Sequence, residues 1–201
     1  MERVILGIDP GTVMMGYGVI KQVGKSIQFI EMDVLNLSKE RDAAKKLHQI
    51  FEHTVRLIEK HQPSCLAIEA PFFGKNVQSM LKLGRAQGVA IAAAMSRSVP
   101  IHEYAPRKIK MAITGKGAAS KEQVAKMLFC LMNIDEITPK YLDATDGLAA
   151  AVCHSLQNDI SASSMSEVSR TLSLSKGANQ KNKKYSGWET FIAQNEERIS
   201  K

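Results

Sequence analysis

The stretch Val4-Ile5-Leu6-Gly7-Ile8-Asp9-Pro10-Gly11 decides the fold. Its first five residues form a continuous apolar run, which is typical of a central strand buried on both faces of a sheet. Pro10 and Gly11 then end the strand in a turn. The sequence therefore predicts that the carboxylate of Asp9 lies where a buried strand ends.

The next segments extend this sheet. Tyr17–Lys21 and Ile27–Leu35 have strand patterns separated by a short turn, which predicts an antiparallel opening. A second buried strand is expected over Cys65–Ile68, and it also ends in an acid, Glu69. Neighbouring parallel strands would place Asp9 and Glu69 at the same edge, where α/β proteins usually bind ligands.

Helices are expected between and after the strands. Periodicity and capping signals predict them over Glu40–Lys60, Asn76–Arg97, Pro106–Ile113, Ser120–Met132 (with Ser120 as N-cap) and Tyr141–Gln157, and Pro100–Tyr104 has a short strand pattern. This alternation predicts an α/β domain with a mixed central sheet flanked by helices. Small residues at Gly84, Gly88 and Ala92 form a stripe on the second helix that would suit either a subunit contact or an intramolecular packing seam.

The composition changes near residue 158. Seven of the fifteen residues from Ser161 to Ser175 are serine, so we expect a domain over residues 1–158 and a Ser/Lys-rich, largely disordered tail over 159–201. Three cysteines, Cys65, Cys130 and Cys153, each lie in an apolar run, which predicts buried free thiols. The protein is expected to be cytoplasmic, because no apolar run is long enough for a signal peptide or a membrane span.

The charge of the chain favours a polyanionic partner. The formal net charge is +7, and residues 75–126 hold ten Lys or Arg against two acids. A basic segment of this kind is typical of nucleic-acid binding. The alternative interpretation is a solvated basic face without a partner.

Two further acids, Asp143 and Asp146, lie on one face of the last expected helix among small apolar residues. An alternative role is to complement the helix dipole, which Asp143 would satisfy better than Asp146. Together with Asp9 and Glu69, they suggest oxygen-only coordination of two Mg²⁺ or Mn²⁺ ions. One ion would activate water and the other would stabilise the leaving 3′-oxygen of a phosphodiester.

Several motifs occur in a characteristic order. They are Gly7-Ile8-Asp9-Pro10-Gly11-Thr12, Gly16-Tyr17-Gly18-Val19, Ala67-Ile68-Glu69, Lys75-Asn76, Leu81-Lys82-Leu83-Gly84, Gln87-Gly88-Val89-Ala90, Glu103-Tyr104-Ala105-Pro106, Ser120-Lys121-Glu122-Gln123-Val124 and Asp143-Ala144-Thr145-Asp146-Gly147-Leu148-Ala149. Over about residues 3–157 this ordered set resembles the RuvC family of Holliday junction resolvases, although each motif alone is weak. Many relatives have alanines at the positions of Thr145 and Gly147, and Gly147 is expected to cost about 1 kcal/mol of helix propensity and to loosen Asp146.

The resemblance implies a ribonuclease H-like domain that acts as a homodimer. It implies that Asp9, Glu69, Asp143 and Asp146 bind the metal ions and catalyse the reaction. Lys110 and Lys121 match family lysines that assist at the scissile phosphate, where an ammonium would stabilise developing charge. The alternative role for both lysines is a plain phosphate clamp.

The resemblance also implies the substrate and partners. These are four-way junction DNA, cut by paired symmetric nicks in homologous recombination and repair, and the branch-migration helicase proteins RuvA and RuvB. Phe72 matches an aromatic that inserts at the junction centre, or else it covers the core. The DNA contacts expected are Phe72, Lys75, Lys82, Arg85, Lys110, Lys116 and Lys121.

Three other functions share some of these features. An actin-like ATPase or sugar kinase would need two lobes and a second phosphate loop, which the sequence lacks. A non-catalytic DNA-binding module would not need all four acids. A ribonuclease H-like nuclease that processes RNA is not excluded by the acids, and only the Phe72 and lysine matches oppose it. His154 is expected to be a packed histidine rather than a ligand.

Overall fold

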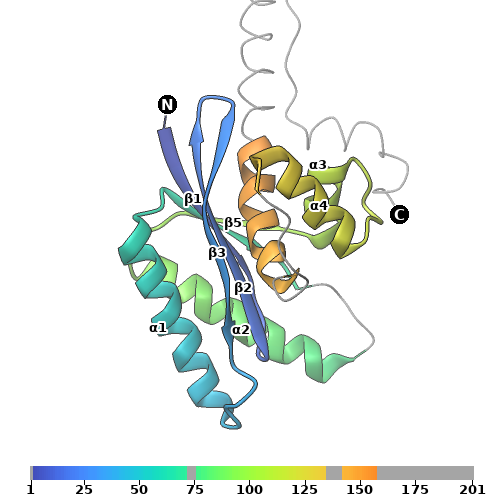
Figure 1. The fold of residues 1–201 in the computed structure, drawn as a ribbon. Coiled ribbons are helices and arrows are strands. Elements are labelled where there is room, and N and C mark those ends of the chain that lie inside the picture. Colours follow the sequence, from blue (N-terminus) through green and yellow to red (C-terminus); the bar gives the residue numbers. More distant parts are fainter. Residues whose placement is uncertain (1, 72–75, 135–141, 158–201) are drawn as a thin grey trace, which may run out of the picture. The chain divides into compact units, whose positions relative to one another are not determined.

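A mixed sheet of five strands forms the centre of the computed structural model, which describes residues 2–71, 76–134 and 142–157 (Figure 1). The strand order is β3-β2-β1-β4-β5. The strands are β1 (Glu2–Asp9), β2 (Met14–Val23), β3 (Ser26–Asn36), β4 (Cys65–Glu69) and β5 (Ile101–Tyr104). Strands β1, β2 and β3 are antiparallel neighbours, whereas β4 and β5 run parallel to β1. The expected α/β class and mixed sheet are confirmed.

Strand β2 begins earlier than its sequence pattern predicts. It starts at Met14 rather than Tyr17, because it pairs along its whole length with β1 and β3. The ladder therefore imposes an extended backbone on Gly16, a residue type with weak intrinsic strand preference. Tertiary pairing, rather than local propensity, sets this end of the strand.

The helices agree with the expected ones to within a few residues at each end. They are α1 (Ala43–His61), α2 (Val77–Met95), α3 (Pro106–Thr114), α4 (Lys121–Met132) and an unlabelled helix over residues 142–157. The Ser120–Gln123 capping box at the start of α4 is confirmed. Helix α1 begins later than Glu40, because the side chain of Asp42 caps it by accepting from the backbone N–H groups of Ala44 and Lys45.

Helices cover both faces of the sheet (Figure 1). Helices α1 and α2 pack against the face that carries Leu6 and Ile8, whereas α3, α4 and the 142–157 helix cover the face that carries Ile5. This alternation within β1 confirms that the strand is buried on both sides. Within the described residues, no helix is both long and apolar enough to cross a membrane.

One expectation on packing, the burial of Cys130, is corrected. Cys65 and Cys153 are buried free thiols as predicted, but Cys130 is exposed. Helix α4 turns Val124 and Leu128 inward, and Cys130 lies on its outer side.

The small-residue stripe of α2 is not a packing seam within the described part of the chain. Gly84, Gly88 and Ala92 are exposed, and an added Cβ on either glycine would meet no atom within 4 Å. The residues of α2 that are buried are Ala86, Gln87, Ala90, Ala93 and Ala94, on another side of the helix. The boundary near residue 158 and the tail over 159–201 lie outside the described residues.

Candidate metal-dependent active site

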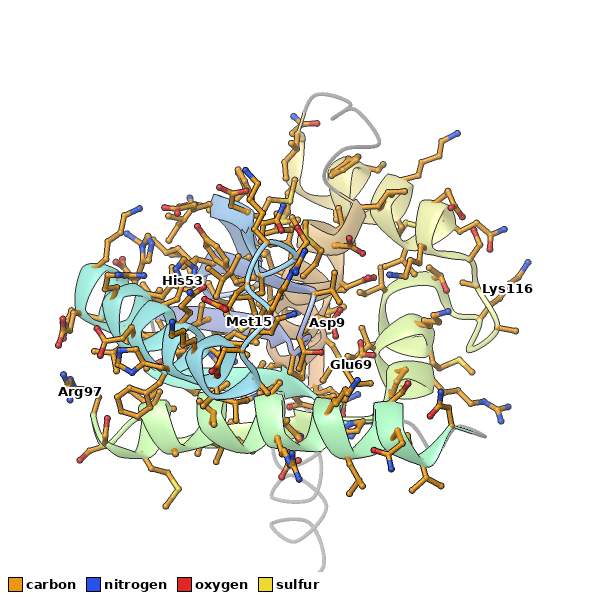
Figure 2. The ribbon with its side chains drawn as sticks, turned by 90° about the horizontal axis from the view of Figure 1, so that it is seen from below. Asp9, Met15, His53, Glu69, Arg97 and Lys116 are labelled. Carbon is orange, nitrogen blue, oxygen red and sulfur yellow. The ribbon has the colours of Figure 1, made fainter. Side chains whose placement is uncertain are left out.

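Asp9 and Glu69 lie side by side because their strands are parallel neighbours. The register pairs Ile8 of β1 with Ile68 of β4, and each strand ends one residue later in its carboxylate. Figure 2 shows both side chains together near the centre of the view, whereas Lys116 lies at the periphery. The sheet edge predicted from the sequence is therefore where the acids meet.

Close backbone contacts place the 142–157 helix directly on β1 and β2. A Cβ added to Gly16 would lie 1.9 Å from the carbonyl oxygen of Asp143, and one added to Gly18 would lie 2.4 Å from Cα of Leu148. A Cβ on Gly147 would lie 2.5 Å from Cα of Tyr17. Since Gly16 is also the strand partner of Asp9, this contact brings Asp143 to the end of β1.

Gly147 therefore has a structural explanation that the sequence did not suggest. Its helix propensity is low, but the position leaves no room for a side chain between the helix and β2. The helix is continuous over residues 142–157, and its buried face includes Ala144 and Leu148. The structure thus gives Gly147 a packing role rather than that of a weak point beside Asp146.

The electrostatics show that the acids share one site. Burial, then repulsion from Asp146, raises the pKa of Asp9 to about 7. Burial, followed by repulsion from Asp9 and Asp146, raises the pKa of Glu69 to about 8. Burial also raises the pKa of Asp146, partly offset by Lys121. The raised pKa values of Asp9 and Glu69 mean that ionising these two carboxyls is costly unless a cation offsets their charge.

Lys121 is the basic residue in direct contact with the acids. Its Nζ lies 2.5 Å from Oδ2 of Asp146 and 3.4 Å from Oδ1 of Asp143. Burial lowers the pKa of the Lys121 ammonium, but the hydrogen bond and charge of Asp146 outweigh it and raise this pKa above its ordinary value. Lys110 on α3 also acts on Glu69 and Asp146 through its charge. Of the two lysines predicted from the sequence, Lys121 thus contacts the carboxylates directly, and Lys110 acts on them through its charge.

The other expected DNA contacts are spread over the surface. Lys82 and Arg85 of α2 line a pocket of about 250 Å³ beside the turn that follows Asp9. Lys116 lines a different, mostly apolar pocket next to α4. Phe72 and Lys75 lie outside the described residues.

The pocket beside the Asp9 turn also contains cations that sequence reasoning missed. Arg41 precedes α1, and Lys46 within α1 donates a 2.8 Å hydrogen bond to the carbonyl oxygen of Thr12. Together with Lys82 and Arg85, they give a pocket with four cationic side chains and no acid among its lining residues. No sequence motif marks Arg41 or Lys46, because α1 reads as an ordinary amphipathic helix.

The donor set fits a hard divalent cation. Four carboxylates converge on one edge of the sheet, and oxygen-rich sites of this kind suit Mg²⁺ or Mn²⁺. Burial and mutual repulsion raise the pKa values of Asp9 and Glu69 even though the charge of Lys121 lowers them, so the negative charge of the acids is only partly offset. A mixed sheet with this strand order and carboxylates at its edge is typical of nucleases of the ribonuclease H-like fold.

Comparison with known proteins identifies the family. The family model described as "Crossover junction endodeoxyribonuclease RuvC" matches residues 5–154. The chain therefore belongs to the RuvC family of metal-dependent endodeoxyribonucleases. It is 56% identical to the crossover junction endodeoxyribonuclease RuvC of Christiangramia forsetii, over 98% of this chain and 93% of the relative. It is 54% identical to that of Bacteroides fragilis, over 98% and 96% respectively.

Solved structures agree with this assignment. The structure of Thermus thermophilus RuvC in complex with a Holliday junction substrate aligns with a TM-score of 0.72 and 28% identity, covering 79% of this chain and 96% of that one. The yeast mitochondrial Holliday junction resolvase Ydc2 aligns with a TM-score of 0.56 at 17% identity, which is a likeness of fold. The expected ribonuclease H-like fold is confirmed.

Proposed function

We propose that this protein resolves four-way DNA junctions by paired symmetric nicks in homologous recombination and DNA repair. The observation that carries the proposal is the convergence of Asp9, Glu69, Asp143 and Asp146 in a chain of this family. The Thermus thermophilus relative has been solved with a Holliday junction substrate, and the same substrate class suits the basic surface beside the acids.

The four acids would hold two Mg²⁺ ions, for which Mn²⁺ would substitute. When bound, such ions supply an activated water and stabilisation of the leaving 3′-oxygen. The protein's own part is to hold the four carboxylates on two strands and one helix, so that little reorganisation is needed. Lys121 and Lys110 would stabilise charge that develops on the scissile phosphate.

DNA would be held beside the site by cations. We propose that Lys82, Arg85, Arg41 and Lys46 bind backbone phosphates, because all four line one pocket next to the Asp9 turn. Lys116, which lines a different pocket, would contact a more distant part of the substrate. The junction-wedge role of Phe72 and the DNA contact of Lys75 stay predictions from the sequence.

The protein would act as a homodimer. The exposed face of α2 carries small and apolar residues in a helical row, namely Val77, Leu81, Gly84, Gly88, Ala92 and Met95. This row suits a second copy, because two active sites related by a two-fold axis would match the symmetry of a four-way junction. RuvA and RuvB as partners, and the cytoplasmic location, stay predictions.

The test is cleavage of a synthetic mobile four-way junction with Mg²⁺, beside linear duplex and an RNA–DNA hybrid. We expect paired symmetric nicks in the junction only. Asp143→Asn is expected to lower the rate by at least about 100-fold, because it removes a charged ligand. Asp33→Asn, an exposed acid on β3, serves as the matched control and should cut at the wild-type rate.

Two outcomes would contradict the proposal in different ways. Cleavage of the RNA–DNA hybrid instead of the junction would leave the assignment of the four acids intact, but it would show that the substrate contains RNA. Wild-type activity of Asp143→Asn would overturn the four-acid assignment itself.

A further inference from the structure

A second group of metal-ligating side chains lies away from the carboxylates. Cys65 of β4, His102 of β5 and His154 of the 142–157 helix each offer one donor atom, and these atoms all lie within 4.8 Å of one another. The three residues are far apart in the sequence, where they form no recognisable zinc motif. The cluster therefore exists only through the fold.

The sheet register and the helix packing bring the cluster together. His102 pairs with Ala67, so it lies on the same face as Cys65, two residues earlier on β4. The 142–157 helix covers this face, and the ring centroids of His102 and His154 are 4.3 Å apart. Cys65 and His154 are buried, whereas His102 is exposed.

We propose that Cys65, His102 and His154 bind a zinc-class divalent cation at a site separate from the carboxylates. A thiolate and two imidazoles form a ligand set that suits Zn²⁺ and not Mg²⁺. With Zn–S and Zn–N bonds of about 2.3 and 2.0–2.1 Å, the ligands of a tetrahedral ion lie roughly 3.3–3.6 Å apart. The donor atoms therefore need to close by at most about 1.5 Å, and the exposed His102 ring can turn to do so.

Tyr104 orients one of the ligands. Its hydroxyl and Nδ1 of His154 form a buried hydrogen bond of 2.7 Å. Metal-binding histidines commonly have one ring nitrogen held in this way, which fixes the tautomer and directs the other nitrogen to the ion. In the proposed site, Nδ1–H donates to Tyr104 and Nε2 of His154 binds the metal.

Metal binding at this site releases one proton, from Cys65. Cys65 binds as the thiolate, so the metal displaces the thiol proton to solvent. Burial raises the pKa of the Cys65 thiol and opposes this step, whereas the nearby charge of Arg3 favours it. Burial, then the charge of His102, lowers the pKa of His154 to about 4, so this imidazole is already neutral near pH 7.

The proposed metal site would link β4 to the 142–157 helix, two of the elements that carry the catalytic acids. Cys65 begins β4 and Glu69 ends it, about 13 Å away at 3.3 Å per residue. His154 lies two turns after Asp146, about 12 Å along the helix. A metal at this end would therefore fix β4 and the 142–157 helix without taking part in cleavage.

Cobalt spectroscopy tests the proposal on the full chain. The metal-free protein is titrated with Co²⁺ in excess Mg²⁺, which occupies the carboxylates. We expect one equivalent of Co²⁺ to give a thiolate-to-cobalt charge-transfer band that Zn²⁺ removes. Carboxylates cannot produce this band, so the result does not depend on the proposed nuclease function.

Variants assign the ligands. Cys65→Ser should abolish the band, and His102→Ala, which changes an exposed side chain, should weaken Co²⁺ binding by at least about tenfold. Cys130→Ser, at an exposed cysteine on α4, is the matched control and should retain both the charge-transfer band and the wild-type affinity for Co²⁺. The absence of a band in the wild type would overturn the proposal, as would a band that survives in Cys65→Ser or depends on Cys130.

Discussion

At the scale of single residues, Lys121 has two effects on the proposed active site, and a substitution distinguishes them. It is bound to Asp146 and Asp143, so it neutralises the acids and also competes with metal for them. We expect Lys121→Ala to lower junction cleavage by about 10²–10³-fold, because a cation near the phosphate is lost. The Mg²⁺ concentration for half-maximal rate should fall or stay constant. A large rise in that concentration would contradict this role.

Asp9 gives a prediction on stability and pH. Its pKa is raised to about 7 from 3.8, so the fold favours the protonated form and loses stability as pH rises through this range. Asp9→Asn stays neutral. It is therefore expected to be more stable than the wild type at pH 8 by about 1–3 kcal/mol, since one pKa unit is worth 1.36 kcal/mol. Near pH 4 the difference should be small.

Thermal unfolding in EDTA at the two pH values measures this difference. Added Mg²⁺ should stabilise the wild type at pH 8 but not Asp9→Asn, because only the wild type has the full set of acids. A stability difference that does not change with pH would show that the charge of Asp9 is not the cause.

At the scale of elements, the contact between β2 and the 142–157 helix sets the position of Asp143 in the proposed active site. Gly16→Ala and Gly18→Ala would both place a Cβ within 2.4 Å of helix backbone atoms, at Asp143 and Leu148 respectively. Each is expected to destabilise the protein by roughly 1–3 kcal/mol through overpacking. Gly16→Ala should lower cleavage more, because it displaces Asp143. Chemical denaturation and cleavage rates on the same samples measure the two effects, and equal loss of activity would contradict this explanation.

The elements also show which features a sequence can predict. The buried strands ending in Asp9 and Glu69 were predictable, because apolar runs and terminal acids are local patterns. The capping box at Ser120 was predictable for the same reason. The cationic pocket with Arg41 and the donor cluster around His102 were not, because each depends on contacts between distant segments. The error on Cys130 arose because an apolar run within a helix does not reveal which side faces outward.

At the scale of the whole molecule, the exposed row on α2 predicts the oligomeric state. Leu81 on α2 and Leu131 on α4 are 52% and 49% exposed, so they allow the same substitution at two comparable surface sites. We expect Leu81→Glu to convert a dimer to a monomer, because it would bury a charge at the proposed interface. Leu131→Glu should stay dimeric. Analytical ultracentrifugation distinguishes them, and a dimeric Leu81→Glu would place the interface elsewhere.

The order of the acids along the chain has a consequence for synthesis. Asp9 is near the beginning, whereas Asp143 and Asp146 belong to the last described helix. Since chains emerge from the ribosome N-terminus first, the sheet can form before the helix that completes the carboxylate set is available. A nascent or truncated chain would then lack two of the four acids, so nuclease activity would appear only once the whole domain has been made.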